Sequence, residues 1–133
     1  DAAGQAFARG LGCVWAGGAD EMPPEALDAA ILFAPAGELV PRALKAVRKG
    51  GTVVCGGIHM SDIPSFPYAD LWGERRIVSV ANLTREDAAL YLPRAAAAGV
   101  KPQVTRYALA DANRALDDLA AGRIEGAGVL VMP

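Results

Sequence analysis

The sequence predicts an α/β protein built on a mainly parallel sheet, and three observations favour this fold class. Short apolar runs of strand length alternate along the chain with segments whose apolar residues recur at helical spacing. Residues 27–34, LDAAILFA, form a near-continuous apolar run, which is typical of a strand buried on both faces of a parallel sheet. Glycines stand where the helices are expected to end. Strands and helices that alternate in this way indicate a parallel sheet covered by helices.

The first part of the chain predicts two helices and three strands. In order, they are a helix over 2–11, a short strand over 13–16, a strand over 27–34, a helix over 36–49 and a strand over 52–57. Phe7 and Leu11 lie four residues apart in the first helix, which Gly12 is placed to end. Gly50 and Gly51 are expected to end the second helix and to turn the chain into the next strand.

The second part of the chain continues the alternation. It predicts a short helix over 68–72, a strand over 76–81, a helix from 85 to about 98, a half-exposed strand over 103–109, an amphipathic helix over 111–121 and a strand over 126–132. Thr84 and Asp87 match the capping-box pattern [ST]-x-x-[DE], so a helix is expected to begin after Thr84. Gly99 and Gly122 are placed to end the two long helices.

Composition excludes several classes of function. The 133 residues are 53% hydrophobic, which is enough for one ordinary domain with a packed core. The net charge of -2, without a basic stripe, argues against nucleic acid or a membrane as partner, and no apolar run is long enough to span a bilayer. Cys13 and Cys55 lie far apart and suit the reducing cytoplasm. The single histidine, His59, belongs to no cluster with metal-ligand spacing, so no metal site is expected in this chain.

The candidate site lies where three predicted strands end, because ligands of open α/β sheets bind beyond the carboxyl ends of the strands. These ends, at residues 34–37, 56–57 and 80–82, carry small or apolar side chains without a nucleophile, a base or a phosphate clamp. Such a surface suits a flat aromatic cofactor ring. No phosphate-binding glycine motif is present. For Gly56 and Gly57, close approach of a ring and a purely structural role are equally supported.

The polar residues near these strand ends have ordinary explanations. For His59, an exposed loop position is commoner than a proton relay, because no carboxylate partner is predictable. Ser61 and Asp62 fit a turn better than a catalytic triad. Cys55 lies inside a predicted strand and is expected to be a small buried side chain.

Three stretches are the most specific part of the sequence: KGGTVVCGGIHMSDIP, LWGERRIVSVANLTRED and ALDDLAAGRIEGAGVLV. In this order and spacing they resemble the C-terminal part of a medium-chain, zinc-type alcohol dehydrogenase, and the resemblance covers nearly the whole chain. Members of that family have a GroES-like catalytic domain, a Rossmann coenzyme domain and a return of the chain to the catalytic domain. The resemblance therefore implies the later strands of a doubly wound Rossmann sheet over residues 1–81 and the return segment over residues 82–133.

The same resemblance implies an oxidoreductase that transfers a hydride between NAD or NADP and an alcohol/aldehyde pair. It assigns three residues at each strand end to the coenzyme: Ala34, Pro35 and Ala36; Gly56, Gly57 and Ile58; Val80, Ala81 and Asn82. The family's zinc ligands lie in its N-terminal domain, so zinc is expected in the complete protein, and neither a zinc ligand nor a catalytic residue is expected in this chain. Where many relatives carry an arginine for the coenzyme phosphates, this chain has Gly126, with Arg123 nearby.

The resemblance also predicts that the chain is a piece of a longer protein, inactive by itself. The glycine-rich pyrophosphate turn and the first sheet strands of the family have no counterpart in the sequence. In the sheet order 3-2-1-4-5-6, the strand at 13–16 has no neighbour without them. The strand at 27–34 is then expected to present an unpaired apolar edge.

Two alternatives to the dehydrogenase stay open at this point. The strand-helix-KGG-strand order over residues 27–54 also resembles half of an S-adenosylmethionine-dependent methyltransferase, which requires a final antiparallel hairpin. A non-catalytic dimerisation piece is expected to self-associate without binding a nicotinamide. A homo-oligomer is expected through the edge strand from Arg76 to Ala81, since medium-chain dehydrogenases often pair this strand with its copy across a two-fold axis.

Overall fold

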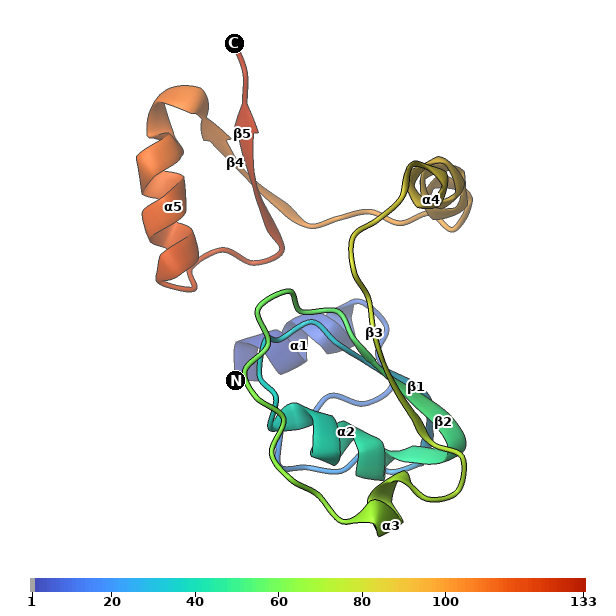
Figure 1. Cartoon of the computed structure of the whole chain (residues 1–133). Coiled ribbons are helices and arrows are strands. Elements are labelled where there is room, and N and C mark those ends of the chain that lie inside the picture. Colours follow the sequence, from blue (N-terminus) through green and yellow to red (C-terminus); the bar gives the residue numbers. More distant parts are fainter. Residues whose placement is uncertain (1) are drawn as a thin grey trace. The chain divides into compact units, whose positions relative to one another are not determined.

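The computed structural model describes residues 2–133, which form two compact units (Figure 1). The first unit ends at Asn82 and the second begins at Leu83. No helix among the described residues is both long and apolar enough to cross a bilayer. Each unit carries its own parallel strands, so the predicted α/β class is confirmed.

The first unit is built on a three-stranded parallel sheet in the order β1-β2-β3. Its elements are α1 (Ala2–Gly10), β1 (Leu27–Leu32), α2 (Leu39–Ala46), β2 (Val47–Cys55), α3 (Tyr68–Leu71) and β3 (Arg76–Ser79). Consecutive strands are neighbours and run in the same direction. Their carboxyl ends therefore lie at one edge of the sheet. That edge is where the sequence predicts the site.

The core of the first unit lies between α2 and one face of the sheet. Leu44 of α2 is fully buried against Val47 and Val53 of β2. Partly buried apolar side chains from the surrounding elements complete this cluster: Ala30, Leu32, Ala43, Phe66, Leu71 and Ile77. Full burial of a side chain such as Leu44 contributes roughly 1.5–3 kcal/mol, so this small cluster stabilises the unit.

The prediction that residues 27–34 are buried on both faces was wrong for the described part of the chain. Ala30 and Leu32 pack against the core, whereas Ile31 is 59% exposed and Phe33 is 79% exposed. Successive side chains of a strand point to opposite faces of the sheet. Since α2 covers only one face, the alternate residues of this apolar run remain in contact with solvent.

The prediction of a strand over residues 13–16 was also wrong. The segment is irregular, and Val14 is fully exposed. Its backbone is held by α1 instead, because the Cys13 N–H donates to the Ala8 carbonyl and the Arg9 guanidinium donates to the Ala16 carbonyl. A strand needs a paired neighbour, and no other strand among residues 2–133 pairs with this segment.

Gly50 and Gly51 do not end α2 as predicted, because they lie inside β2. The helix stops at Ala46, and its C-cap residue, Val47, already has extended backbone angles. Gly50 has a φ of 74°, and its N–H donates to the Gly73 carbonyl over 2.8 Å. A β-carbon on Gly51 would lie only 2.8 Å from the Arg48 carbonyl oxygen. The glycine pair therefore forms a kink within β2, and its role is structural, as expected.

The second unit contains two parallel strands joined through a helix. Its elements are α4 (Arg85–Ala97), β4 (Val104–Ala108), the short 3-10 turn η1 (Leu109–Asp111), α5 (Ala112–Ala120) and β5 (Ala127–Val131). β4 pairs with β5 in parallel, from Val104 beside Ala127 to Ala108 beside Val131. The strand pairs among residues 2–133 are all parallel, so the antiparallel hairpin that a methyltransferase requires is not found there.

The helix boundaries predicted for the second unit are confirmed. Thr84 Oγ1 accepts a hydrogen bond from the Asp87 N–H over 3.1 Å, and the Asp87 carboxylate accepts one from the Thr84 N–H over 2.8 Å. This reciprocal pair is the expected capping box at the start of α4. Gly99 and Gly122 follow α4 and α5 with φ values of 68° and 66°, a conformation that favours glycine.

Candidate functional site

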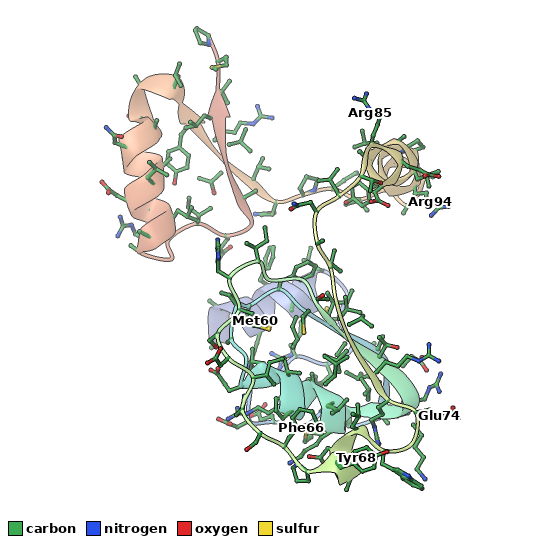
Figure 2. The ribbon with its side chains drawn as sticks, viewed as in Figure 1. Met60, Phe66, Tyr68, Glu74, Arg85 and Arg94 are labelled. Carbon is green, nitrogen blue, oxygen red and sulfur yellow. The ribbon has the colours of Figure 1, made fainter. Side chains whose placement is uncertain are left out.

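The carboxyl ends of β1, β2 and β3 form one edge of the sheet in the first unit. Leu32 lies beside Cys55, and Cys55 lies beside Ser79, in the parallel register. Met60, on the loop after β2, and Glu74, just before β3, are at opposite ends of the strands (Figure 2). The three segments predicted to hold a cofactor ring therefore leave the sheet from neighbouring positions.

Backbone hydrogen bonds extend the pairing just beyond the strand ends. The Gly56 N–H donates to the Leu32 carbonyl over 2.8 Å, and the Val80 N–H donates to the Cys55 carbonyl over 3.0 Å. These bonds fix the first residue of each departing segment. Ala81 and Asn82 lie further along the chain, are exposed, and form no hydrogen bond with a described residue.

Gly56 and Gly57 allow two of the strand ends to lie close together. A β-carbon on Gly57 would be 3.3 Å from Pro35 Cα, and one on Gly56 would be 3.4 Å from the Leu32 carbonyl oxygen. The separation at Gly57 is tight for a β-carbon, whereas the one at Gly56 is an ordinary van der Waals contact, so packing between the two segments gives a reason for glycine at Gly57. The contact with Pro35 supports a structural role for Gly57. Contact of the two glycines with a coenzyme ring remains a prediction.

A serine bridges the same two segments, and sequence reasoning did not predict it. Ser61 Oγ accepts a hydrogen bond from the partly buried Gly37 N–H over 2.9 Å, and the Ser61 N–H donates to the Pro35 carbonyl over 3.2 Å. A β-carbon on Gly37 would overlap the carbonyl oxygens of Ser61 and Asp62. Ser61 and Gly37 are 24 positions apart, so no local pattern indicates this bridge.

Three large apolar side chains are exposed at this edge. Phe33 is 79% exposed, Ile58 is 73% exposed and Val80 is 56% exposed. The nine predicted residues include one polar side chain, Asn82, and no ionisable group. This edge can hold an uncharged flat ring by apolar contact and through its backbone groups, but the nine predicted side chains offer no acid or base.

The residues described by the structure do not provide a metal site. Nowhere in residues 2–133 do three His, Cys, Asp or Glu side chains come close enough together to hold a metal ion. His59 and Asp62 are both exposed in the loop after β2. The side chains present therefore do not fit zinc.

A tyrosine-centred network occupies the second unit. The buried Tyr107 donates its hydroxyl hydrogen to Asp118 over 3.0 Å, and Arg123 Nε donates to the same carboxylate over 2.8 Å. The bond from Arg123, with a further one from Tyr107, holds the pKa of Asp118 below its ordinary value. Burial, together with the bond to Asp118, raises the pKa of Tyr107. Arg123, which lies near the position where many relatives carry an arginine for the coenzyme phosphates, thus bonds to a carboxylate of its own unit.

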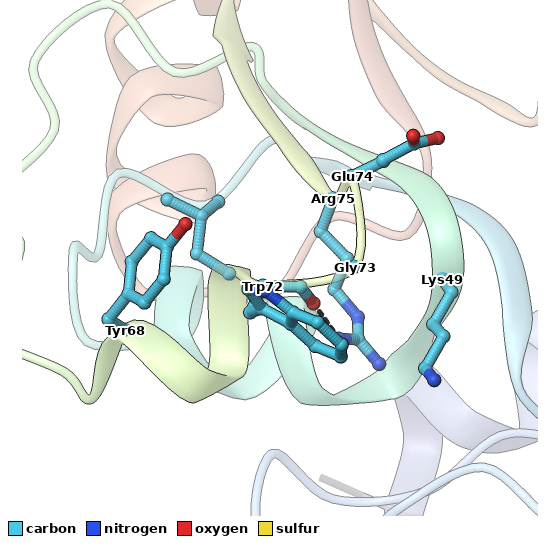
Figure 3. A pocket seen from close by; sticks show the side chains of 7 residues that line it. Lys49, Tyr68, Trp72, Gly73, Glu74 and Arg75 are labelled. Atoms are coloured by element: carbon cyan, nitrogen blue, oxygen red, sulfur yellow. Dashed lines mark hydrogen bonds between the residues drawn. The ribbon is translucent and has the colours of Figure 1, made fainter.

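A hollow of about 740 Å³ lies at the amino ends of β2 and β3, away from the predicted edge (Figure 3). Lys49 Nζ stands 5.5 Å from the centre of the Trp72 ring, and Arg75 donates to the carbonyls of Trp72 and Val47. These contacts tie the turn before β3 to the start of β2. Since ligands of parallel sheets bind at the carboxyl ends, we assign this hollow a structural role.

The sequence has a clear relative. Over 123 residues, or 92% of this chain, it is 47% identical to the protein named Probable alcohol dehydrogenase AdhA from Mycobacterium tuberculosis (strain CDC 1551 / Oshkosh). The chain is homologous to this probable alcohol dehydrogenase. It spans 36% of the length of that relative. No protein-family model matches the chain.

Solved structures share the fold of this chain. An alcohol dehydrogenase zinc-binding domain protein from Burkholderia ambifaria matches with a TM-score of 0.81 at 19% identity, over 100% of this chain and 40% of that one. AibC matches with a TM-score of 0.69 at 26% identity, over 81% of this chain and 30% of that one. The Bacillus subtilis protein yhfP with NAD bound matches with a TM-score of 0.62 at 16% identity, over 82% of this chain and 35% of that one.

Proposed function

We propose that this chain is the nicotinamide-binding side of an oxidoreductase that transfers a hydride between NAD or NADP and an alcohol/aldehyde pair. The observation that carries this proposal is the 47% identity to an alcohol dehydrogenase over 92% of the chain. The apolar edge formed by three neighbouring strand ends supports the position of the site. The chain spans about a third of its relative, so the reaction belongs to a longer protein.

The nine residues at the strand ends would orient the coenzyme, which supplies the hydride when bound. Pro35 and Ala36, with Ala34, would line one side of it. Gly56 and Gly57 would leave room for the nicotinamide ring, with the Ile58 side chain against its face. The remaining three residues would flank the ring: Val80, Ala81 and Asn82. None of them exchanges a proton, so their contribution is orientation and the exclusion of water.

Zinc and the alcohol would be bound by parts of the longer protein outside these 133 residues, because no described side chains fit a metal ion. Residues 1–81 would belong to its coenzyme domain and residues 82–133 to its catalytic domain. The exposed Val78 on the edge strand β3 favours a homo-oligomer through that edge. The free thiols of Cys13 and Cys55 favour the cytoplasm.

The test is a titration of the chain with NADH and, separately, with NADPH, followed by dihydronicotinamide fluorescence. We expect saturable binding through the nicotinamide half, which the two coenzymes share. The variant Ile58→Asp should bind at least about tenfold more weakly, because its carboxylate would lose water against the ring without gaining a partner.

The matched control is Ile63→Asp, at a 44% exposed isoleucine of the same loop that is not among the predicted coenzyme residues. Its affinity should equal that of the parent chain. No binding of either coenzyme, or equal weakening by both variants, would contradict the proposed site.

A further inference from the structure

Ser61 is the point at which the loop after β2 is tied to the turn after β1. Its hydroxyl oxygen accepts a hydrogen bond from the Gly37 N–H over 2.9 Å. Its own N–H donates to the Pro35 carbonyl over 3.2 Å. One residue thus bonds to both sides of a turn in which Gly37 is buried and Pro35 is exposed.

The loop that Ser61 ties down has little other order of its own. Between the end of β2 at Cys55 and the start of α3 at Tyr68 the chain forms neither helix nor strand. Gly56 is fixed by its bond to the Leu32 carbonyl, and Ser61 is the next residue bonded to the β1 side of the site. Ile58 lies between these two fixed points and is 73% exposed. The position of Ile58 relative to the turn at Pro35 therefore depends on Ser61.

We infer that Ser61 is a positioning residue for the coenzyme: its hydroxyl sets the gap between the two strand-end segments that flank the nicotinamide ring. This inference rests on the proposed function. For this role, residue 61 must provide an oxygen atom that accepts the hydrogen bond from the Gly37 N–H. Threonine retains that acceptor and alanine removes it, leaving a partly buried donor without a partner.

The experiment uses the chain itself, with reduced nicotinamide mononucleotide as the probe, because this molecule carries the reactive ring without the adenosine half. Its fluorescence is titrated against four proteins: the parent chain, Ser61→Ala, Ser61→Thr and Ser65→Ala. Ser65 is an exposed serine of the same loop whose side chain bonds to no described residue, so it is the matched control. Thermal unfolding of each protein is recorded in parallel.

We expect Ser61→Ala to bind the probe about tenfold more weakly, the effect of a lost hydrogen bond together with its unsatisfied donor. Ser61→Thr should bind within about twofold of the parent chain, since its hydroxyl rescues the bond. Ser65→Ala should be unchanged. If Ser61→Ala is unfolded, Ser61→Cys replaces it, because a thiol is a much weaker acceptor. Unchanged affinity in a folded Ser61→Ala variant, even with lower thermal stability, would overturn the inference.

Hydrogen exchange of the Gly37 amide separates this inference from the proposed function, because it is measured without a ligand. We expect faster exchange in Ser61→Ala than in the parent, Ser61→Thr or Ser65→Ala chains. If the parent chain does not bind the probe, the nicotinamide site is contradicted, whatever the exchange shows. If the parent binds and Gly37 exchanges equally in all four proteins, the bridge itself is disproved while the proposed function stands.

Discussion

Gly37 is the residue of the first unit where an added β-carbon would meet the most rigid surroundings. It would overlap backbone carbonyl oxygens of Ser61 and Asp62, which cannot rotate away as a side chain can. The φ of Gly37 does not lie in the left-handed region, so backbone conformation does not require glycine here. Glycine is required because the two loops touch at this position. At Gly57 the equivalent contact is looser, 3.3 Å from Pro35 Cα.

The first prediction, at the scale of the residue, is that Gly37→Ala destabilises the chain by about 1–3 kcal/mol, the usual cost of overpacking. The control is Gly10→Ala, because a β-carbon on Gly10 would meet nothing within 4 Å and alanine is favoured in a helix. Urea unfolding measures both. Equal free energies of unfolding for the two variants would show that the loops do not make this contact.

At the scale of the element, α4 depends on its cap because none of its residues is buried. Such a helix gains little from packing, and its first turn is held by the reciprocal bonds of Thr84 and Asp87. These bonds from Thr84 lower the pKa of Asp87 from its ordinary value of 3.8. A carboxyl group whose pKa is lowered by folding stabilises the folded state above that ordinary value, and this contribution is lost as the pH falls through the lower one.

The second prediction follows from this capping box. Thr84→Ala should cost about 1 kcal/mol of helix stability, and Asp87→Ala should remove the pH dependence of α4 below pH 4. Amide exchange along α4, measured as the pH is lowered, provides the readout. Glu86→Ala removes a charge from the same turn but no bond of the box, so it is the matched control. A helix equally stable in all three variants would refute the role of the cap.

At the scale of the whole molecule, the three-stranded sheet of the first unit leaves both its outer strands unpaired among residues 2–133. Ile31 on β1 is 59% exposed and Val78 on β3 is 42% exposed, so both edges carry apolar side chains. Unpaired strands with exposed apolar residues favour pairing with another chain. The sequence predicts that the strand at 27–34 has an unpaired edge. The corresponding strand, β1, is an outer strand of the sheet and has this unpaired edge among the described residues.

The third prediction distinguishes these two edges by oligomeric state. Val78→Lys should shift the chain toward the monomer in sedimentation velocity, because a two-fold pairing of β3 would bring two lysines together. Ile31→Lys is the matched substitution on β1 and should leave the β3 pairing intact. A monomeric parent chain would contradict self-association, and dissociation by Ile31→Lys alone would assign it to β1.

The sequence by itself determined the features that depend on neighbouring residues in the chain. The alternation of apolar runs determined the α/β class, while Thr84, Gly99 and Gly122 marked the helix ends, because caps and left-handed glycines act within one turn of the helix. The grouping of strand ends 34–37, 56–57 and 80–82 was also predictable, since parallel strands end at the same edge.

Tertiary structure decided the features that depend on residues distant in the chain. The segment 13–16 has strand-like residues but no strand among residues 2–133 to pair with, and residues 27–34 are apolar but covered on one face. The kink at Gly50 depends on its bond to Gly73, and the bridge at the site depends on Ser61 meeting Gly37. Pairing, coverage and hydrogen bonding between separate segments are properties of the fold, so no local pattern carries them.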